Sequence, residues 1–238
     1  MRTHLALPTD PAESFVREVD ENLRRDQAHE FLKKNGPWIV GAVLLFLAAV
    51  AGWLYWQDQQ RKQAEAATER LNQVMTDIGA GQTAQVDQRL QPLEESGPEG
   101  VSAAARLTRA AVALDKADRK AAIAEYRSIM DDKGLADPYR HLATVRLTAL
   151  EFDQLKPEDV IARLKPLAVA GNAWFGSAGE MTAMALLKQG KKDEAGRMFA
   201  AIAADNQVPD TIRSRAVQIA GTLGIDATAS LPAVARQD

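Results

Sequence analysis

The segment from Trp38 to Trp56 constrains this chain most, because WIVGAVLLFLAAVAGWLYW contains no charged residue. A helix rises about 1.5 Å per residue, so a helix of this length just crosses a hydrocarbon core roughly 30 Å thick. Residues 1–37 precede the segment and residues 57–238 follow it. We therefore expect a module tethered to a membrane rather than a soluble enzyme.

The flanks of the segment favour a membrane span. Lys33 and Lys34 stand just before it, and tryptophans stand at both ends. Aromatic rings of this kind favour the two membrane–water interfaces. Gly36-Pro37 predicts the start of the spanning helix, because proline is tolerated in a first helical turn.

Three other interpretations compete with a span. Ala49-Val50-Ala51 resembles a signal-peptide cleavage site, but the preceding stretch is long and apolar residues continue through Trp56. A buried core helix rarely lacks charge for so long. A helix lying flat at the interface needs a polar face, which this segment does not have.

The basic residues around the span indicate its orientation only weakly. Those on the N-terminal side are Arg24, Arg25, Lys33 and Lys34, and those on the other side are Arg61, Lys62 and Arg70. Long C-terminal domains translocate with little regard to charge. We expect a cytoplasmic N-terminus and an external C-terminal domain, while the small bias leaves an adaptor of inverted topology open.

Composition bounds the fold and the partners. The 238 residues suffice for one anchor and one domain, and a net charge of −3 argues against nucleic acid as a partner. Cysteine is absent, which excludes disulfides, thiol catalysis and cysteine metal sites. Abundant alanine and few β-branched runs predict an all-α chain.

We divide the chain into four predicted parts. Residues 1–35 form a cytoplasmic amphipathic arm whose helix starts at Asp10-Pro11, after a disordered beginning. An apolar stripe at Phe15, Val19 and Leu23 rests on the membrane or a partner, or else the arm is simply solvated. Residues 36–57 are the span, which continues into a helical domain over 58–224. Residues 225–238 are a loose tail.

The domain contains an internal repeat. Residues 105–129 and 180–202 superimpose with a shift of 73, each with a turn in the middle, at 115–119 and at Gly190. The matched positions are Ala110 with Ala183, Ala122 with Ala195, Tyr126 with Phe199, and Ile129 with Ile202. Small alanines let two helices approach closely, and the large aromatic fills the gap to the next unit. Gly190 suits the left-handed turn between them better than its counterpart Ala117.

A second match has almost the same shift. RLQPL at 89–93 corresponds to RLKPL at 163–167, displaced by 74. Such a shift is about two units close to the tetratricopeptide period of about 34 residues. We predict a tetratricopeptide-like α-solenoid, with Pro92 and Pro166 each ending or kinking a helix. A terminal helix is expected to have Asp210 as its N-cap and Gly224 as its stop.

The sequence offers little catalytic chemistry. His4, His29 and His141 form no pair at metal spacing, and no HExxH, GxSxG, P-loop or GxGxxG motif occurs. The acidic pairs at 94–95 and 131–132 stand beside glycines, like solvated helix ends. We expect no metal, no cofactor and no small-molecule substrate.

Two groups of residues are candidates for protein binding. Arg106, Arg109, Arg140 and Arg146 line a concave face and meet carboxylates, or lie on solvated helix faces. Trp174 and Phe175 stand beside a predicted helix start. They either pack between units or form a surface for apolar peptide.

The block FVREVDENLRRDQAHEFLKKNGPWIVG at 15–41, the span after it and the Ala/Gly/Phe pattern at 183–199 resemble the bacterial ancillary SecYEG translocon subunits, the YfgM-type proteins. The resemblance implies an inner-membrane protein with a periplasmic repeat domain. It implies association with the Sec translocon and with periplasmic chaperones that handle newly exported proteins. It brings no catalytic residues.

These observations predict a binding protein and not an enzyme. The expected partners are Sec subunits, a periplasmic chaperone or exported chains, together with membrane lipid along residues 38–56. The domain would scaffold the chaperone or hold emerging chains. The alternative is a scaffold for another envelope complex, in outer-membrane assembly or cell division.

Overall fold

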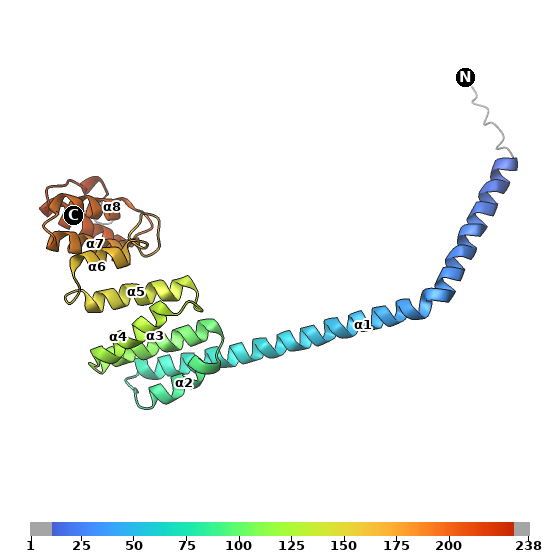
Figure 1. Cartoon of the computed structure of the whole chain (residues 1–238), viewed down its shortest axis with the longest axis horizontal. Helices are drawn as coiled ribbons and strands as arrows, with labels where there is room; N and C mark the ends of the chain where they lie inside the picture. Colours follow the sequence, from blue (N-terminus) through green and yellow to red (C-terminus); the bar gives the residue numbers. More distant parts are fainter. Residues whose placement is uncertain (1–10, 231–238) are drawn as a thin grey trace, which may run out of the picture. The chain divides into compact units, whose positions relative to one another are not determined.

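The computed structural model describes residues 11–230, and their side chains from residue 33 onward. All regular structure in this range is helical, with nine α-helices and one short 3-10 turn (Figure 1), which confirms the all-α prediction. The chain divides into two compact units, residues 1–63 and 64–238. The predicted disordered start, the Asp10 cap and the side chains of the apolar stripe lie outside what is described.

The described part of the first unit is one stretch of helix α1 (Pro11–Gly79). The helix begins at Pro11, as the sequence predicts. It then runs through Pro37 without ending, so the prediction that a separate helix starts at Gly36-Pro37 is wrong. A proline removes one backbone hydrogen bond, yet α1 continues past it to Gly79.

The apolar segment of α1 lies open to its surroundings. From Lys33 onward, α1 is long and apolar enough to cross a membrane. The side chains from Trp38 to Trp56 are exposed, Trp38 to 82%. This exposure argues against the alternative of a buried core helix. A continuous apolar surface of this kind suits contact with lipid, because it is unfavourable in water.

The second unit starts with the last turns of α1, so the predicted continuation of the spanning helix into the domain is confirmed. The helices that follow are α2 (Val86–Ser96), α3 (Glu99–Asp115), α4 (Arg119–Asp131), α5 (Asp137–Glu151), α6 (Pro157–Leu164), α7 (Phe175–Lys188), α8 (Lys192–Ala204) and α9 (Asp210–Thr222).

The helices of this unit stack as a solenoid. From α2 to α9 each helix contacts the next along the chain, and α3, α5, α7 and α9 also contact one another in succession. The core consists of four apolar clusters, and each joins helices that follow one another. This is the predicted tetratricopeptide-like arrangement, in which a unit's apolar face is covered by its neighbour.

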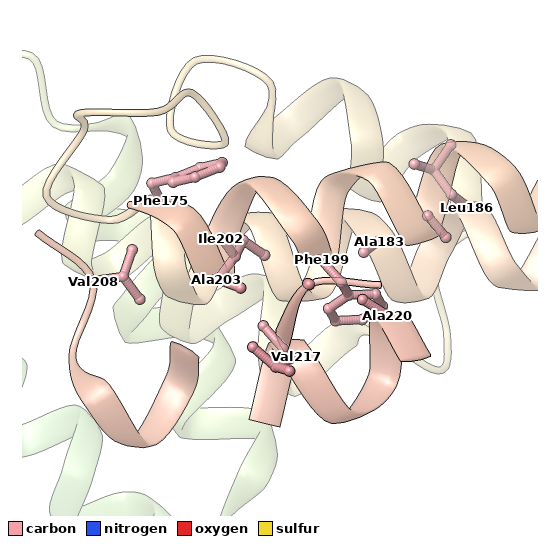
Figure 2. Close-up of a cluster of buried hydrophobic side chains, with 12 residues drawn as sticks. Phe175, Ala183, Leu186, Phe199, Ile202, Ala203, Val208, Val217 and Ala220 are labelled. Atoms are coloured by element: carbon pink, nitrogen blue, oxygen red, sulfur yellow. The ribbon is translucent and has the colours of Figure 1, made fainter. Parts of the chain in front are cut away.

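The alternation of small and large residues builds these contacts as predicted. The matched alanines are fully buried, namely Ala110, Ala122, Ala183 and Ala195. Tyr126 and Phe199 are 4% and 1% exposed. Figure 2 shows Phe199 of α8 beside Val217 and Ala220 of α9. The aromatic ring therefore fills the space toward the next helix.

The two segments matched at a shift of 74 also occupy equivalent positions in the fold. Its leucines are buried in both copies, Leu90 with Leu164 and Leu93 with Leu167. The shift extends to an ion pair that sequence analysis missed. Arg89 Nη1 lies 2.6 Å from Asp77 Oδ2, and Arg163 Nη1 lies 2.7 Å from Glu151 Oε2. Each pair joins α2 or α6 to the helix before it.

The turns and prolines agree only in part with the predictions. Gly190 adopts a left-handed φ of 77°, and Ala117 adopts 61° at the matching place. Pro166 follows the end of α6, as expected. Pro92 lies inside α2, which continues four residues beyond it to Ser96.

The end of the solenoid differs from the prediction. Asp210 is the first residue of α9 and not its N-cap, and its Oδ1 lies 3.2 Å from Arg213 Nη1. Gly224, with a φ of 83°, follows the helix as predicted. Ile225 packs on the last core cluster and Ala227 is buried in it, before the turn η1 (Thr228–Ser230). The prediction of a loose tail is therefore wrong for residues 225–230.

Candidate functional site

Two of the predicted arginines, Arg106 and Arg109 of α3, meet carboxylates of this chain. Arg106 Nη1 lies 2.6 Å from Asp132 Oδ2. Arg109 bridges two glutamates, with Nη1 2.8 Å from Glu94 Oε2 and Nη2 3.0 Å from Glu125 Oε2. These contacts tie α3 to α2 and to the end and middle of α4. The two side chains therefore help to hold the helices together, and their role in binding a partner stays a prediction.

Glu94 is not a simple solvated helix end, whereas Asp132 does stand at the end of α4 with its side chain partly exposed. The side chain of Glu94 is only 10% exposed. Burial raises the pKa of Glu94, and the charge of Arg109 opposes this shift. The pKa of Asp132 is lowered, first by its hydrogen bond from Arg106 and then by one from the backbone N–H of Gly134.

The third predicted arginine, Arg140, also has a structural role. Its Nη1 lies 3.0 Å from Asp137 Oδ1, and its Nε donates to the carbonyl of Met130 at 3.4 Å. At a shift of 73, Arg213 makes the equivalent contacts. Its Nη1 pairs with Asp210 Oδ1, and its Nε donates to the carbonyl of Ala203 at 3.0 Å. An arginine in each copy thus fastens the start of one helix to the end of the helix before it.

Trp174 and Phe175 belong mainly to the core. Phe175 is 2% exposed and lies in the cluster drawn in Figure 2. It offers no surface to a partner, which corrects its choice as a contact residue. Trp174 is half-buried against the cluster formed by α5, α6 and α7, and its backbone N–H donates to Asn172 Oδ1 at 2.9 Å.

The last predicted arginine, Arg146, is exposed and lines an open groove of about 540 Å³. The groove runs over α1, α3 and α5 with Tyr126 of α4 in its wall, and we call it the first groove. Its lining is mostly apolar: Met75, Ile78, Leu107, Thr108, Ala111, Val112, Leu114, Asp115, Tyr126, Leu142 and Arg146.

A second groove, of about 440 Å³, lies over α5, α7 and α9. Its lining is Ala149, Phe152, Asp153, Glu180, Met181, Met184, Phe199, Arg215 and Ile219. Helix α5 contributes to both grooves.

The two grooves are the same surface repeated along the solenoid. The shift of 73 places Tyr126 on Phe199, Leu107 on Glu180, Leu142 on Arg215 and Arg146 on Ile219. Sequence reasoning missed the grooves because it followed only the buried small and large positions. The same shift, applied to the flanking positions, pairs residues of the two linings, but the sequence does not show that these positions form grooves.

The two grooves differ in whether their arginine is paired with a carboxylate. In the second groove, Arg215 Nε and Nη2 donate to the two carboxylate oxygens of Glu180, each at 2.6 Å, and this pairing raises the pKa of Arg215. In the first groove, no hydrogen bond or ion pair joins Arg146 to any residue whose side chain is described. Its charge acts on Tyr126, where it opposes the rise in pKa that burial causes.

The two grooves offer mostly apolar surface for non-covalent binding. Within residues 33–230, no group of three His, Asp or Glu side chains is placed to hold a metal ion. Open apolar grooves on a stack of helices fit the side chains of another polypeptide. This arrangement, joined to an exposed apolar helix, defines a membrane-anchored helical-repeat protein of the protein-binding class.

Comparison with known proteins specifies the family. The family described as "Tetratricopeptide repeat-like domain" matches residues 29–220, and the chain belongs to this family. The chain is similar to the protein named "Ancillary SecYEG translocon subunit" of Escherichia coli (strain K12), with 26% identity over 181 residues, which cover 74% of this chain and 84% of that protein.

The protein of the same name from Haemophilus influenzae (strain ATCC 51907 / DSM 11121 / KW20 / Rd) is 22% identical over 181 residues, which cover 76% of this chain and 87% of that protein. No solved structure gives a significant match. The resemblance inferred from residues 15–41, the span and residues 183–199 is therefore confirmed.

Proposed function

We propose that this chain is a bacterial inner-membrane protein that binds other proteins beside the Sec translocon. Its repeat domain would hold newly exported chains or scaffold a periplasmic chaperone. The names of the two relatives, each covered over more than four fifths of its length, support the association with the translocon. The membrane assignment is supported by the exposed apolar segment of α1.

The pair of open apolar grooves is the observation that carries the binding role. Outside the apolar segment, the exposed large apolar side chains among those described are Met75, Val169 and Met184. Met75 lies in the first groove and Met184 in the second. Flexible thioether side chains adapt to differently shaped partners. Such a lining suits the varied segments of unfolded chains.

The membrane anchor would contribute to binding by raising the effective concentration of the domain near its partners. A domain tethered to the membrane meets other membrane complexes at a high effective concentration, so weak groove contacts suffice. A chain emerging from a translocon would be held near the exit until it folds or passes to a chaperone. No chemical step is required of the domain.

The proposed orientation places the N-terminus in the cytoplasm and the repeat domain in the periplasm. Alkaline phosphatase fused after residue 238 should be active, because this reporter matures only outside the cytoplasm. A fluorescent protein that folds only in the cytoplasm should stay dark at the same place. The reverse pair of results would establish the inverted topology and contradict the proposal.

Affinity purification from detergent-solubilised membranes tests the partners. The full chain should retain Sec subunits and a periplasmic chaperone after stringent washing. A matched control joins residues 1–63 to an unrelated periplasmic domain, and it should lose the chaperone. The proposal is contradicted if the full chain retains no Sec component, or if the control retains the same proteins.

A further inference from the structure

We propose that the first groove binds an apolar segment of a partner protein that carries a carboxylate, and that this carboxylate pairs with Arg146. This inference rests on the proposed binding function and adds the chemistry that one groove recognises. It is drawn from the difference between two repeat-related grooves in the same chain.

The second groove shows how an arginine is paired when the repeat also supplies an acid. It contains one arginine, Arg215, whose Nε and Nη2 donate bidentate hydrogen bonds to the carboxylate of Glu180. Glu180 stands where the first groove has Leu107, and Arg215 stands where it has Leu142. The second groove therefore neutralises its own cation, with an acid from the neighbouring helix.

The first groove has a cation without this acid. Arg146 extends from α5, one turn beyond Leu142, and the helix opposite presents Leu107 in place of an acid. Asp115, the last residue of α3, also lines this groove. No ion pair within 4.0 Å joins Asp115 to Arg146, although the structure describes both side chains.

Occupation of the groove would change the surroundings of Arg146. The guanidinium is now solvated, and an apolar segment laid over Met75, Ile78 and Leu107 would remove much of that water. A cation that loses water without gaining a partner costs free energy, whereas a carboxylate placed against it forms a charge-assisted bond. The groove thus favours an apolar segment with an acid over the same segment without one.

Binding of paired peptides to the full chain in lipid nanodiscs tests the inference. Each pair consists of a short apolar peptide with one glutamate and its twin with glutamine at that place. We expect the glutamate peptides to bind about tenfold more tightly, since a hydrogen bond to a charged group contributes roughly 1.5 kcal/mol or more. Equal affinity within every pair, or no binding at all, would overturn the inference.

Substitutions test whether the preference for glutamate peptides depends on Arg146. Arg146→Glu should reverse the preference within each pair, and Arg146→Lys should keep part of it. Arg197→Glu makes the same charge change on an exposed position of α8 outside both grooves, and it should leave the preference intact. If Arg197→Glu and Arg146→Glu act alike, net charge explains the preference and the assignment to the groove is wrong.

Two other occupants would appear as distinct results. If deletion of residues 231–238 strengthens peptide binding about tenfold, the chain's own terminus occupies the groove, and the partner assignment is overturned. If the chain self-associates and Arg146→Glu abolishes this, the occupant is a second copy, which also overturns it. Retention of Sec subunits in the purification would leave the proposed function standing in either case.

Discussion

At the scale of single residues, Ala117 and Gly190 occupy equivalent turns and share a left-handed backbone conformation, although one is alanine and the other glycine. Both connect the helices of a unit in the left-handed region, at φ 61° and 77°. An L side chain is disfavoured there, whereas glycine is not. Nothing lies within 4 Å of a Cβ added at Gly190, so backbone conformation alone should decide the effect of exchanging the two residues.

We therefore expect opposite effects from the two exchanges. Ala117→Gly should raise the free energy of unfolding by about 0.5–1 kcal/mol, and Gly190→Ala should lower it by a similar amount. Urea denaturation of the full chain, followed by circular dichroism, measures both. Effects of the same sign would show that contacts, and not the left-handed backbone, dominate at these turns.

Asp132 and Asp205 are repeat-related acids whose pKa values lie below the ordinary 3.8. For Asp132 the main cause is the hydrogen bond from Arg106, and for Asp205 it is the backbone N–H groups of Gly171 and Gln207. Because the folded pKa is depressed, the stabilisation is present above pH 3.8 and is lost as the pH falls through the folded pKa.

A variant with Asp132→Asn and Asp205→Asn should therefore melt lower than the wild type at about pH 5, and its melting temperature should fall less than that of the wild type on acidification. Thermal melts between about pH 5 and pH 3 would show the two curves converging. Parallel curves would mean that these carboxylates do not contribute to acid sensitivity.

Residue patterns predicted burial better than they predicted partners. The buried alanines, Tyr126 and Phe199 follow from their spacing, because one face of each helix must meet the next unit. The partners of Arg106 and Arg109 do not follow, because their carboxylates belong to other helices or helix ends, whereas Asp137 is only three residues from Arg140 on the same helix. The positions of the partners of Arg106 and Arg109 depend on packing, which a single sequence does not specify.

At the scale of elements, α2, α3 and α4 are fastened by the bridge from Arg109 to Glu94 and Glu125. Removing the arginine leaves Glu94, only 10% exposed, without its partner. An unpaired, poorly solvated carboxylate destabilises a fold strongly. The bridge should therefore contribute more to stability than the exposed ion pairs on the solenoid surface.

We expect Arg109→Leu to lower the free energy of unfolding by about 2 kcal/mol, below the range for fully buried pairs because Arg109 is 30% exposed. Adding Glu94→Leu should recover part of the loss. Arg197→Leu, at an exposed position, serves as the control and should change stability little. A loss in Arg109→Leu no larger than in this control would contradict the account.

The existence of the helices was more predictable than their ends. The turns between α3 and α4 and between α7 and α8 lie where the repeat placed them, and α1 begins at the predicted proline. Pro37 and Pro92 did not end their helices, although each removes one backbone hydrogen bond. Asp210 was taken for a cap, but α9 begins one residue earlier than that role requires.

At the scale of the whole molecule, one displacement of 73 to 74 residues relates buried leucines, ion pairs, turns and both grooves. A second copy retained the core and the shape of the groove while its charges changed. The sequence predicted the solenoid and the apolar segment, since both depend on long patterns. It did not predict the grooves, because they arise between helices far apart along the chain.

Photo-crosslinking in intact cells tests the central claim, that the anchored domain binds proteins beside the Sec translocon. A photo-reactive residue at Ala111 in the first groove should capture Sec subunits, a periplasmic chaperone or exported chains, identified by mass spectrometry. The same residue at Arg197, outside both grooves, should capture far less. Capture of cytoplasmic proteins alone at Ala111, or equal capture at both positions, would contradict the account.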